Sequence, residues 1–111
     1  MLHLQSSDLI TFVTEKIEDM KGRDLVTLDV AKKSGFTDYM LVCSGNSKRH
    51  VISIAQSLVI ECRAAGLEAL GVEGTDIGEW SLVDLGDVIV HVMTDEIRDR
   101  YQLEDLWEES V

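Results

Sequence analysis

The sequence predicts a single α/β (α+β) domain, with a mixed sheet of about five strands flanked by helices. Two segments carry apolar residues at helical spacing, and five shorter ones have the length and apolar content of strands. In mid-chain a strand, a helix and another strand follow one another, which requires a crossover connection, whereas a glycine-containing turn near residue 86 predicts an antiparallel hairpin. At 111 residues, we take the domain to span residues 1–111.

The first part of the chain predicts a helix, two strands and a second helix. Ser7 is a candidate N-cap, and apolar residues recur at helical spacing as far as Met20, with Gly22 as the predicted stop. Residues 25–30 predict a short strand with mixed faces. Residues 39–43 form a continuous apolar run, typical of a strand covered on both faces. The second helix follows Ser47 and ends at Gly66.

The later part predicts three strands and a closing helix. Residues 67–72 form the third strand, and an acidic, glycine-containing loop over residues 73–78 follows it. Residues 80–85 and 88–93 read as two strands that a tight turn joins into a hairpin. Residues 97–107 predict the closing helix, although its apolar period is less regular.

The excess negative charge belongs entirely to residues 67–111. Residues 1–66 hold eight Asp and Glu and eight Lys and Arg, whereas residues 67–111 hold thirteen Asp and Glu against only Arg98 and Arg100, which accounts for the formal charge of −11. A solvated face is the simpler interpretation of such charge. The field nevertheless repels nucleic-acid phosphates and attracts basic surfaces, so we predict no binding to DNA.

The composition indicates a protein of a reducing compartment. No apolar run approaches the ~20 residues of a membrane-spanning helix, and residues 1–7 lack the features of a secretory signal. Cys43 and Cys62 follow no metal-ligand or redox spacing, and Cys43 lies in an apolar run that should raise its pKa. We therefore expect a cytoplasmic protein with no membrane contact, no cofactor and no metal.

The segment from Ser44 to His50 is the strongest candidate for binding a small ligand. Free backbone amides at the start of the second helix, together with Lys48 and Arg49, would suit a phosphate group. The simpler interpretation is structural, because Ser47 would cap the helix and a glycine before it would permit the turn. An enzyme that binds a nucleotide or a phosphate metabolite at this turn is the alternative function.

Asp84, Asp87 and His91 group carboxylates and an imidazole close together in the sequence. They could bind a metal or transfer a proton. Strand alternation places Asp87 and His91 on one face with Ile89 and Met93, which favours a structural role or surface recognition over catalysis. No serine or cysteine has the setting of a nucleophile. We therefore predict no catalytic residues and no enzyme.

Several segments, taken in order, resemble the Iojap family of ribosomal silencing factors. The resemblance covers nearly the whole chain, and its most specific part runs from the first tryptophan to the last histidine. The matching segments are Gly22-Arg23-Asp24, Thr37-Asp38-Tyr39, Ser44-Gly45-Asn46-Ser47-Lys48-Arg49-His50, Glu73-Gly74, Trp80 followed by Asp84-Leu85-Gly86-Asp87-Val88-Ile89-Val90-His91, and Tyr101-Gln102-Leu103-Glu104-Asp105-Leu106-Trp107.

The resemblance implies a function that needs no chemistry. Members of the family resemble nucleotidyltransferases in fold but are not known as enzymes. Membership implies a translation repressor that binds the large ribosomal subunit through ribosomal protein L-fourteen, where the small subunit would join. Occupying that surface would prevent subunit association and lower translation when nutrients are scarce. The resemblance also leaves a homodimer open, because some members look dimeric.

The resemblance and the charge distribution together predict where the partner binds. Trp80 follows a glycine-containing loop beside acidic residues, which suits an interface anchor as well as a core residue. We expect the acidic part of the chain to face a basic ribosomal protein, with salt-sensitive attraction. The predicted partner-binding residues are Trp80, Asp84, Leu85, Asp87, His91 and Met93.

Overall fold

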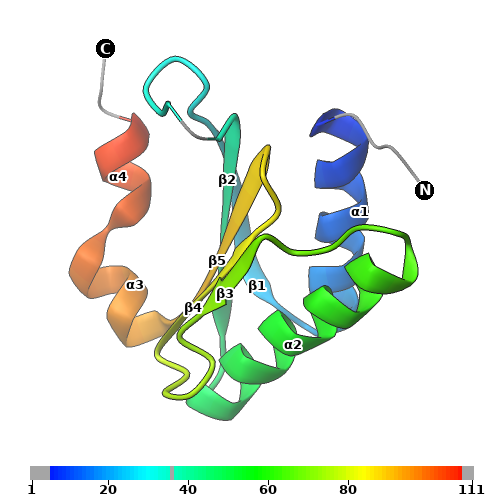
Figure 1. Ribbon diagram of the computed structural model, residues 1–111. Coiled ribbons are helices and arrows are strands. Elements are labelled where there is room, and N and C mark those ends of the chain that lie inside the picture. Colours follow the sequence, from blue (N-terminus) through cyan, green and yellow to red (C-terminus); the bar gives the residue numbers. More distant parts are fainter. Residues whose placement is uncertain (1–5, 36, 109–111) are drawn as a thin grey trace.

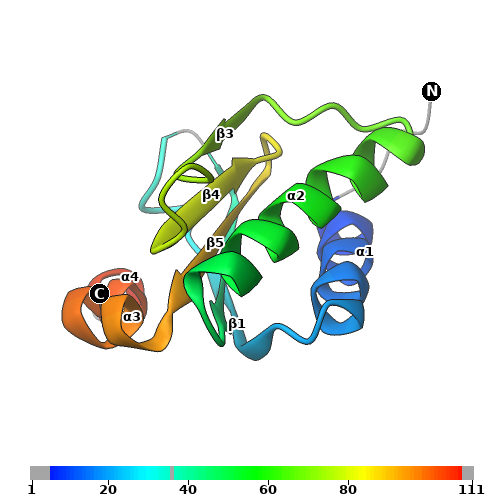
Figure 2. The same ribbon diagram turned by 90° about the horizontal axis from the view of Figure 1, so that it is seen from below.

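A computed structural model describes residues 6–35 and 37–108 as a sheet with helices on both faces (Figures 1 and 2). Helices α1 (Ser6–Asp19) and α2 (Lys48–Ala64) lie on one face, which we call the first face. Helices α3 (Asp95–Tyr101) and α4 (Leu103–Glu108) lie on the opposite, second face. None of the described helices has the length and apolar content that a membrane-spanning helix needs.

The sheet confirms the predicted mixed topology. Its strands are β1 (Arg23–Asp29), β2 (Tyr39–Gly45), β3 (Gly71–Glu73), β4 (Trp80–Asp84) and β5 (Val88–Thr94), in the spatial order β1-β2-β5-β4-β3. The β2 and β5 strands pair in parallel, and the other neighbours are antiparallel. The parallel pair is possible because α2 carries the chain away from the end of β2, so that it returns along the far edge of the sheet. The predicted likeness to nucleotidyltransferases stays a prediction.

Side-chain alternation along β2 and β5 divides the core into two clusters. On the first face, Leu41 and Cys43 pack with Val90 against α1 and α2. On the second face, Val42 and Met93 pack with residues of α3 and β1. Burial raises the pKa of the Cys43 thiol to about 12, in the direction that its apolar run predicts.

The first helix differs from its prediction at both ends. It begins at Ser6, so Ser7 lies in the first turn and its carbonyl accepts a hydrogen bond from Thr11 Oγ1 at 3.1 Å. It ends at Asp19 because Lys21, not the predicted Gly22, adopts the left-handed conformation, with φ 65°.

The predicted third strand over residues 67–72 is largely wrong. The strand β3 holds only Gly71–Glu73. Leu67 instead completes the end of α2, where Gly66 has φ 87° and the Leu67 amide donates to the Cys62 carbonyl at 2.8 Å. The chain first bonds to β4 at Leu70, whose amide donates to the Asp84 carbonyl at 2.7 Å. The chain reversal after α2 therefore takes up the first residues of the predicted strand. Leu70, at the end of this stretch, is 74% exposed.

The closing helix is divided into α3 and α4. Gln102 between them has φ 46° and ψ 52°, and its amide donates to the Arg98 carbonyl at 2.9 Å. A left-handed residue reverses the path of a helix. Helix α4 therefore starts in a new direction and contacts β1. Figure 1 shows α3 and α4 together to the left of the sheet.

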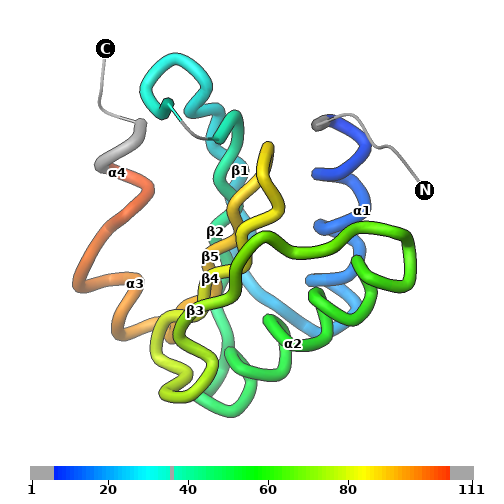
Figure 3. The backbone as a smooth tube through the Cα atoms, viewed as in Figure 1, coloured from blue at the N-terminus to red at the C-terminus, as the bar shows by residue number. Residues whose placement is uncertain are grey.

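The loop between β3 and β4 passes beside the first turn of α2 (Figure 3). Gly78 in this loop has φ 84°, and a Cβ atom there would lie 2.6 Å from the Lys48 carbonyl oxygen. The backbone of the loop therefore approaches the helix closely, as only glycine allows. This contact sets where β4 begins.

Candidate functional site

The β4–β5 hairpin places three pairs of side chains on the second face. Trp80 lies opposite Met93, Leu82 opposite His91, and Asp84 opposite Ile89. The predicted shared face of Ile89, His91 and Met93 is confirmed. Helices α3 and α4 cover the β1, β2 and β5 side of this face, while none of the described helices covers its β4 and β3 side (Figure 2).

Trp80 is locked between the sheet and α3. Its indole Nε1–H donates to His91 Nδ1 at 3.0 Å, and its ring centroid lies 5.3 Å from that of Tyr101. The side chain is partly buried against the second-face cluster. Trp80 therefore packs against the core and is also partly exposed. Its sequence context allowed both a core residue and an interface anchor.

His91 is a buried, neutral imidazole. It is 5% exposed, and burial lowers its pKa to about 4. Because Nδ1 accepts from Trp80, the proton of the neutral ring lies on Nε2. Within residues 6–35 and 37–108, Nε2 has no hydrogen-bond partner. The role of His91 in the structure is therefore to orient the Trp80 ring.

This burial predicts a pH-dependent stability. The pKa of His91 is about 4 in the folded chain against 6.5 for an unperturbed histidine, so the unfolded chain binds the extra proton between these values. Stability that is fully present above pH 6.5 should fall as the pH drops toward 4. Urea unfolding at a series of pH values measures this slope. The variant His91→Gln keeps an acceptor for Trp80 but cannot titrate, so its slope should be shallower, and equal slopes would contradict the assignment.

The other predicted site residues are distributed over two faces and the core. Asp84 Oδ1 accepts from the Gly86 amide at 2.9 Å and so closes the hairpin turn. Leu85 packs against the first-face cluster, away from Trp80. Asp87 precedes β5 rather than lying in it, and its side chain is exposed in the turn. Met93 is fully buried and supports Trp80 from beneath instead of reaching the surface.

Two residues that the sequence reasoning did not select complete this part of the second face. Leu82 is partly buried between Trp80 and Asp84 along β4. Tyr101, at the end of α3, is 57% exposed. Strand alternation from Trp80 would have found Leu82. Nothing local in the sequence indicates that Tyr101 packs on Trp80, since the contact depends on where α3 lies.

The turn from Ser44 to His50 is held together by its own polar groups. Ser47 caps α2 as predicted, with its Oγ accepting from the His50 amide at 3.1 Å. The Asn46 amide donates to His50 Nδ1 at 2.8 Å, and His50 Nε2 donates to the Met20 carbonyl at 2.7 Å. These bonds tie the turn to the end of α1. The arrangement matches the structural interpretation of the segment.

The surroundings of this turn disfavour a phosphate group. The pocket beside it includes the carboxylates of Glu79, Asp95 and Glu96. Lys48, the basic residue in its lining, forms an ion pair with Glu79 at 3.5 Å. Three carboxylates facing one paired ammonium group would repel an anion, whatever the helix dipole contributes.

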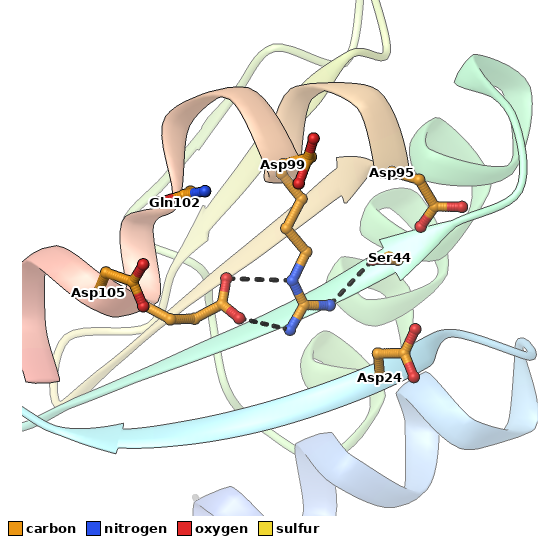
Figure 4. A pocket seen from close by; sticks show the side chains of 8 residues that line it. Asp24, Ser44, Asp95, Asp99, Gln102 and Asp105 are labelled. Carbon is orange, nitrogen blue, oxygen red and sulfur yellow. Dashed lines mark hydrogen bonds and ion pairs between the residues drawn. The ribbon is translucent and has the colours of Figure 1, made fainter.

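A second pocket lies between α3, α4 and the ends of β1 and β2 (Figure 4). Arg98 projects into it and donates to both carboxylate oxygens of Glu104, at 3.1 and 3.0 Å, and to Ser44 Oγ at 2.9 Å. The side chains of Arg98 and Glu104 are 12% and 23% exposed. Four further carboxylates line the pocket, from Asp24, Asp95, Asp99 and Asp105.

The polar contacts around this acidic pocket join α3 to β1 and β2. Arg23 donates to Asp95 at 2.8 Å and holds the pKa of that carboxyl below its usual range. Across the part of the chain that the structure describes, no group of three or more His, Cys, Asp or Glu side chains is arranged to hold a metal ion. Arg98 carries no local signal of this role in the sequence, because its partners lie 54 and 6 residues away.

Comparison with known proteins identifies the family. The pattern of the family described as "Ribosomal silencing factor during starvation" matches residues 3–111. The chain belongs to this family. The resemblance that the motifs indicated is therefore confirmed, and the match extends over almost the entire chain.

Relatives from bacteria and from mitochondria agree with this assignment. "Ribosomal silencing factor RsfS" of Haemophilus influenzae is 46% identical over 99 residues, which cover 89% of this chain and 97% of the relative. A crystal structure of a Chromobacterium violaceum protein has a TM-score of 0.92 and 39% identity, and the match covers 95% of this chain and 88% of that one. The mouse protein "Mitochondrial assembly of ribosomal large subunit protein 1" is 30% identical over 110 residues, which cover 95% of this chain and 47% of the mouse protein.

Proposed function

We propose that this chain represses translation by binding the large ribosomal subunit through ribosomal protein L-fourteen and sterically blocking the small subunit from joining, when nutrients are limiting. Family membership supports the ribosomal association, and the name of the mouse relative refers to the large ribosomal subunit. A cytoplasmic location would follow from this role.

The observation that carries the proposal is the exposed part of the second face around Trp80. Trp80 is held by His91, so little conformational freedom is lost when a partner covers it. Asp84 follows on the same face of β4, and Glu73 lies opposite Leu82 on β3. An ordered aromatic ring beside carboxylates fits a basic protein surface better than it fits RNA.

Blocking by occupancy needs binding but no turnover. A standard interface buries about 800 Å² on each partner. The accessible surface of this domain is 6454 Å², so such an interface would use roughly one eighth of it. We propose that the chain is not an enzyme, since the polar groups of the Ser44 to His50 turn already bond one another.

Co-sedimentation with separated ribosomal subunits tests the proposal. The wild-type chain should bind the large subunit and be absent from joined ribosomes. Trp80→Ala should weaken binding by about 2 kcal/mol, or roughly 30-fold, because it removes the central ring.

The matched control is Ile60→Ala. Ile60 is 66% exposed on α2, across the sheet from Trp80, and its loss should leave binding unchanged. Thermal unfolding would establish that both variants are folded. Normal large-subunit binding by folded Trp80→Ala would remove Trp80 from the interface, and a wild-type chain that ignores the large subunit would end the proposal.

A further inference from the structure

The exposed ring surface of the second face is built from two separate elements. Trp80 comes from β4 and Tyr101 from the last turn of α3, and their rings are 5.3 Å apart and tilted by 50°. Tyr101 is 57% exposed although it packs on a tryptophan. The pair therefore forms one aromatic cluster in which Tyr101 is exposed and Trp80 is partly buried, which we call the Trp80–Tyr101 surface.

The hydrogen-bonding capacity of Trp80 is already used. An indole has a single donor, and that of Trp80 is committed to His91 Nδ1 at 3.0 Å. A partner that covers Trp80 can therefore meet only its ring. Recognition by a tryptophan ring alone is apolar or involves a cation above the π-system.

The position of Tyr101 is fixed from the other side of α3. Arg98, one turn earlier in the helix, reaches Ser44 on β2, while Tyr101 packs on Trp80 of β4. Ile97, one turn before Tyr101, is 6% exposed and packs into the second-face cluster. The helix thus lies across β5 with contacts on both sides, so the two rings are aligned before any partner arrives.

Two carboxylates share the second face with the ring surface by strand register, further along β4 and β3. Asp84 is on the same face of β4 as Trp80, and Glu73 on β3 lies directly opposite Leu82. Neither carboxylate forms an ion pair with any of the described residues. Their charge favours a cation at the rings and disfavours a nucleotide base with its phosphates.

We infer that the Trp80–Tyr101 surface receives an arginine or lysine side chain of a basic protein partner, with the two rings contacting the cation and Glu73 and Asp84 supplying the attracting charge. This inference rests on the proposed function and specifies the chemistry by which the partner is recognised. It also adds Tyr101 as a contact residue.

Binding of purified large ribosomal subunits to a set of variants tests the inference. Tyr101→Phe keeps the ring and removes only the hydroxyl, so it should stay within about 3-fold of wild-type affinity. Tyr101→Leu keeps an apolar side chain but removes the ring, and it should weaken binding about 5-fold or more. Because Tyr101 is exposed, this variant should fold normally.

The charge contribution is tested with Glu73→Gln against Glu18→Gln, an exposed glutamate of α1 on the opposite face. Glu73→Gln should weaken binding several-fold at low salt and little at high salt, whereas Glu18→Gln should have no effect. Wild-type affinity in Tyr101→Leu, or a loss in Tyr101→Phe as large as in Trp80→Ala, would overturn the inference while the proposed function stands. Tighter binding by Glu73→Gln would also overturn it, in favour of contact with ribosomal RNA. Failure of the wild-type chain to bind would instead refute the proposed function.

Discussion

Replacing Gly74 by alanine should destabilise the fold by about 3 kcal/mol. Gly74 has φ 78°, a conformation that costs a residue with a side chain roughly 1–2 kcal/mol. A Cβ atom there would also overlap the Trp80 carbonyl oxygen and lie 3.3 Å from Ser81 Cα. Overpacking of this kind costs about 1–3 kcal/mol. Because the obstacle is backbone, the start of β4 would have to move, and Trp80 with it.

Urea unfolding of Gly74→Ala beside Gly71→Ala measures this cost. Gly71 lies three residues earlier in the same edge strand, and a Cβ atom there would meet no other atom within 4 Å. Gly71→Ala should therefore leave stability unchanged or raise it by up to about 1 kcal/mol. Equal stabilities for the two variants would show that the loop before β4 moves freely and does not position Trp80.

The hairpin and the sequence of helices and strands along the chain could be predicted because their signals are local. Alternation from Val88 to Met93 and the glycine of the turn determine which face each side chain occupies. The helix α2 could be predicted for the same reason, since Ser47 caps it and Gly66 follows its end. These features need only a few neighbouring residues to be recognised.

The third strand and the closing helix required information from distant residues. Residues 67–72 have the composition of a strand. The Leu67 amide, however, donates to the Cys62 carbonyl and so belongs to the end of α2. The break between α3 and α4 at Gln102 contains no glycine or proline that would have indicated it in the sequence. It follows from packing, because Leu103 packs against the second-face cluster.

The candidate site shows the same division between local and distant signals. Trp80 and His91 were found from the sequence, and their hydrogen bond follows from adjacent strands in register. Leu85 was placed with them although it points to the first face. Tyr101 was missed because its contact with Trp80 depends on the position of α3, which Arg98 fixes by a hydrogen bond to Ser44, 54 residues away in the sequence.

Replacing Arg98 by alanine should therefore destabilise the protein by about 2 kcal/mol and loosen the attachment of α3 and α4. Breaking a fully buried ion pair costs roughly 3–5 kcal/mol and breaking an exposed one about 0–1. With side chains 12% and 23% exposed, the pair with Glu104 lies nearer the buried case. The loss also leaves the pocket of Figure 4 with five carboxylates and no cation among its described lining residues. Added salt should restore part of the stability, because it screens the repulsion between these carboxylates.

Arg100 provides the matched control on the same helix. It pairs with Glu96 at 3.1 Å, but the two side chains are 59% and 81% exposed, so Arg100→Ala should cost less than about 0.5 kcal/mol. Hydrogen exchange of the α3 and α4 amides should accelerate in Arg98→Ala and stay unchanged in Arg100→Ala. If α3 loosens, Tyr101 no longer holds its place beside Trp80, and binding to the large subunit should weaken although no contact residue has been changed. Equal stability and equal exchange in the two variants would mean that α3 and α4 are held by their apolar contacts alone, and the alignment of the two rings would then not depend on Arg98.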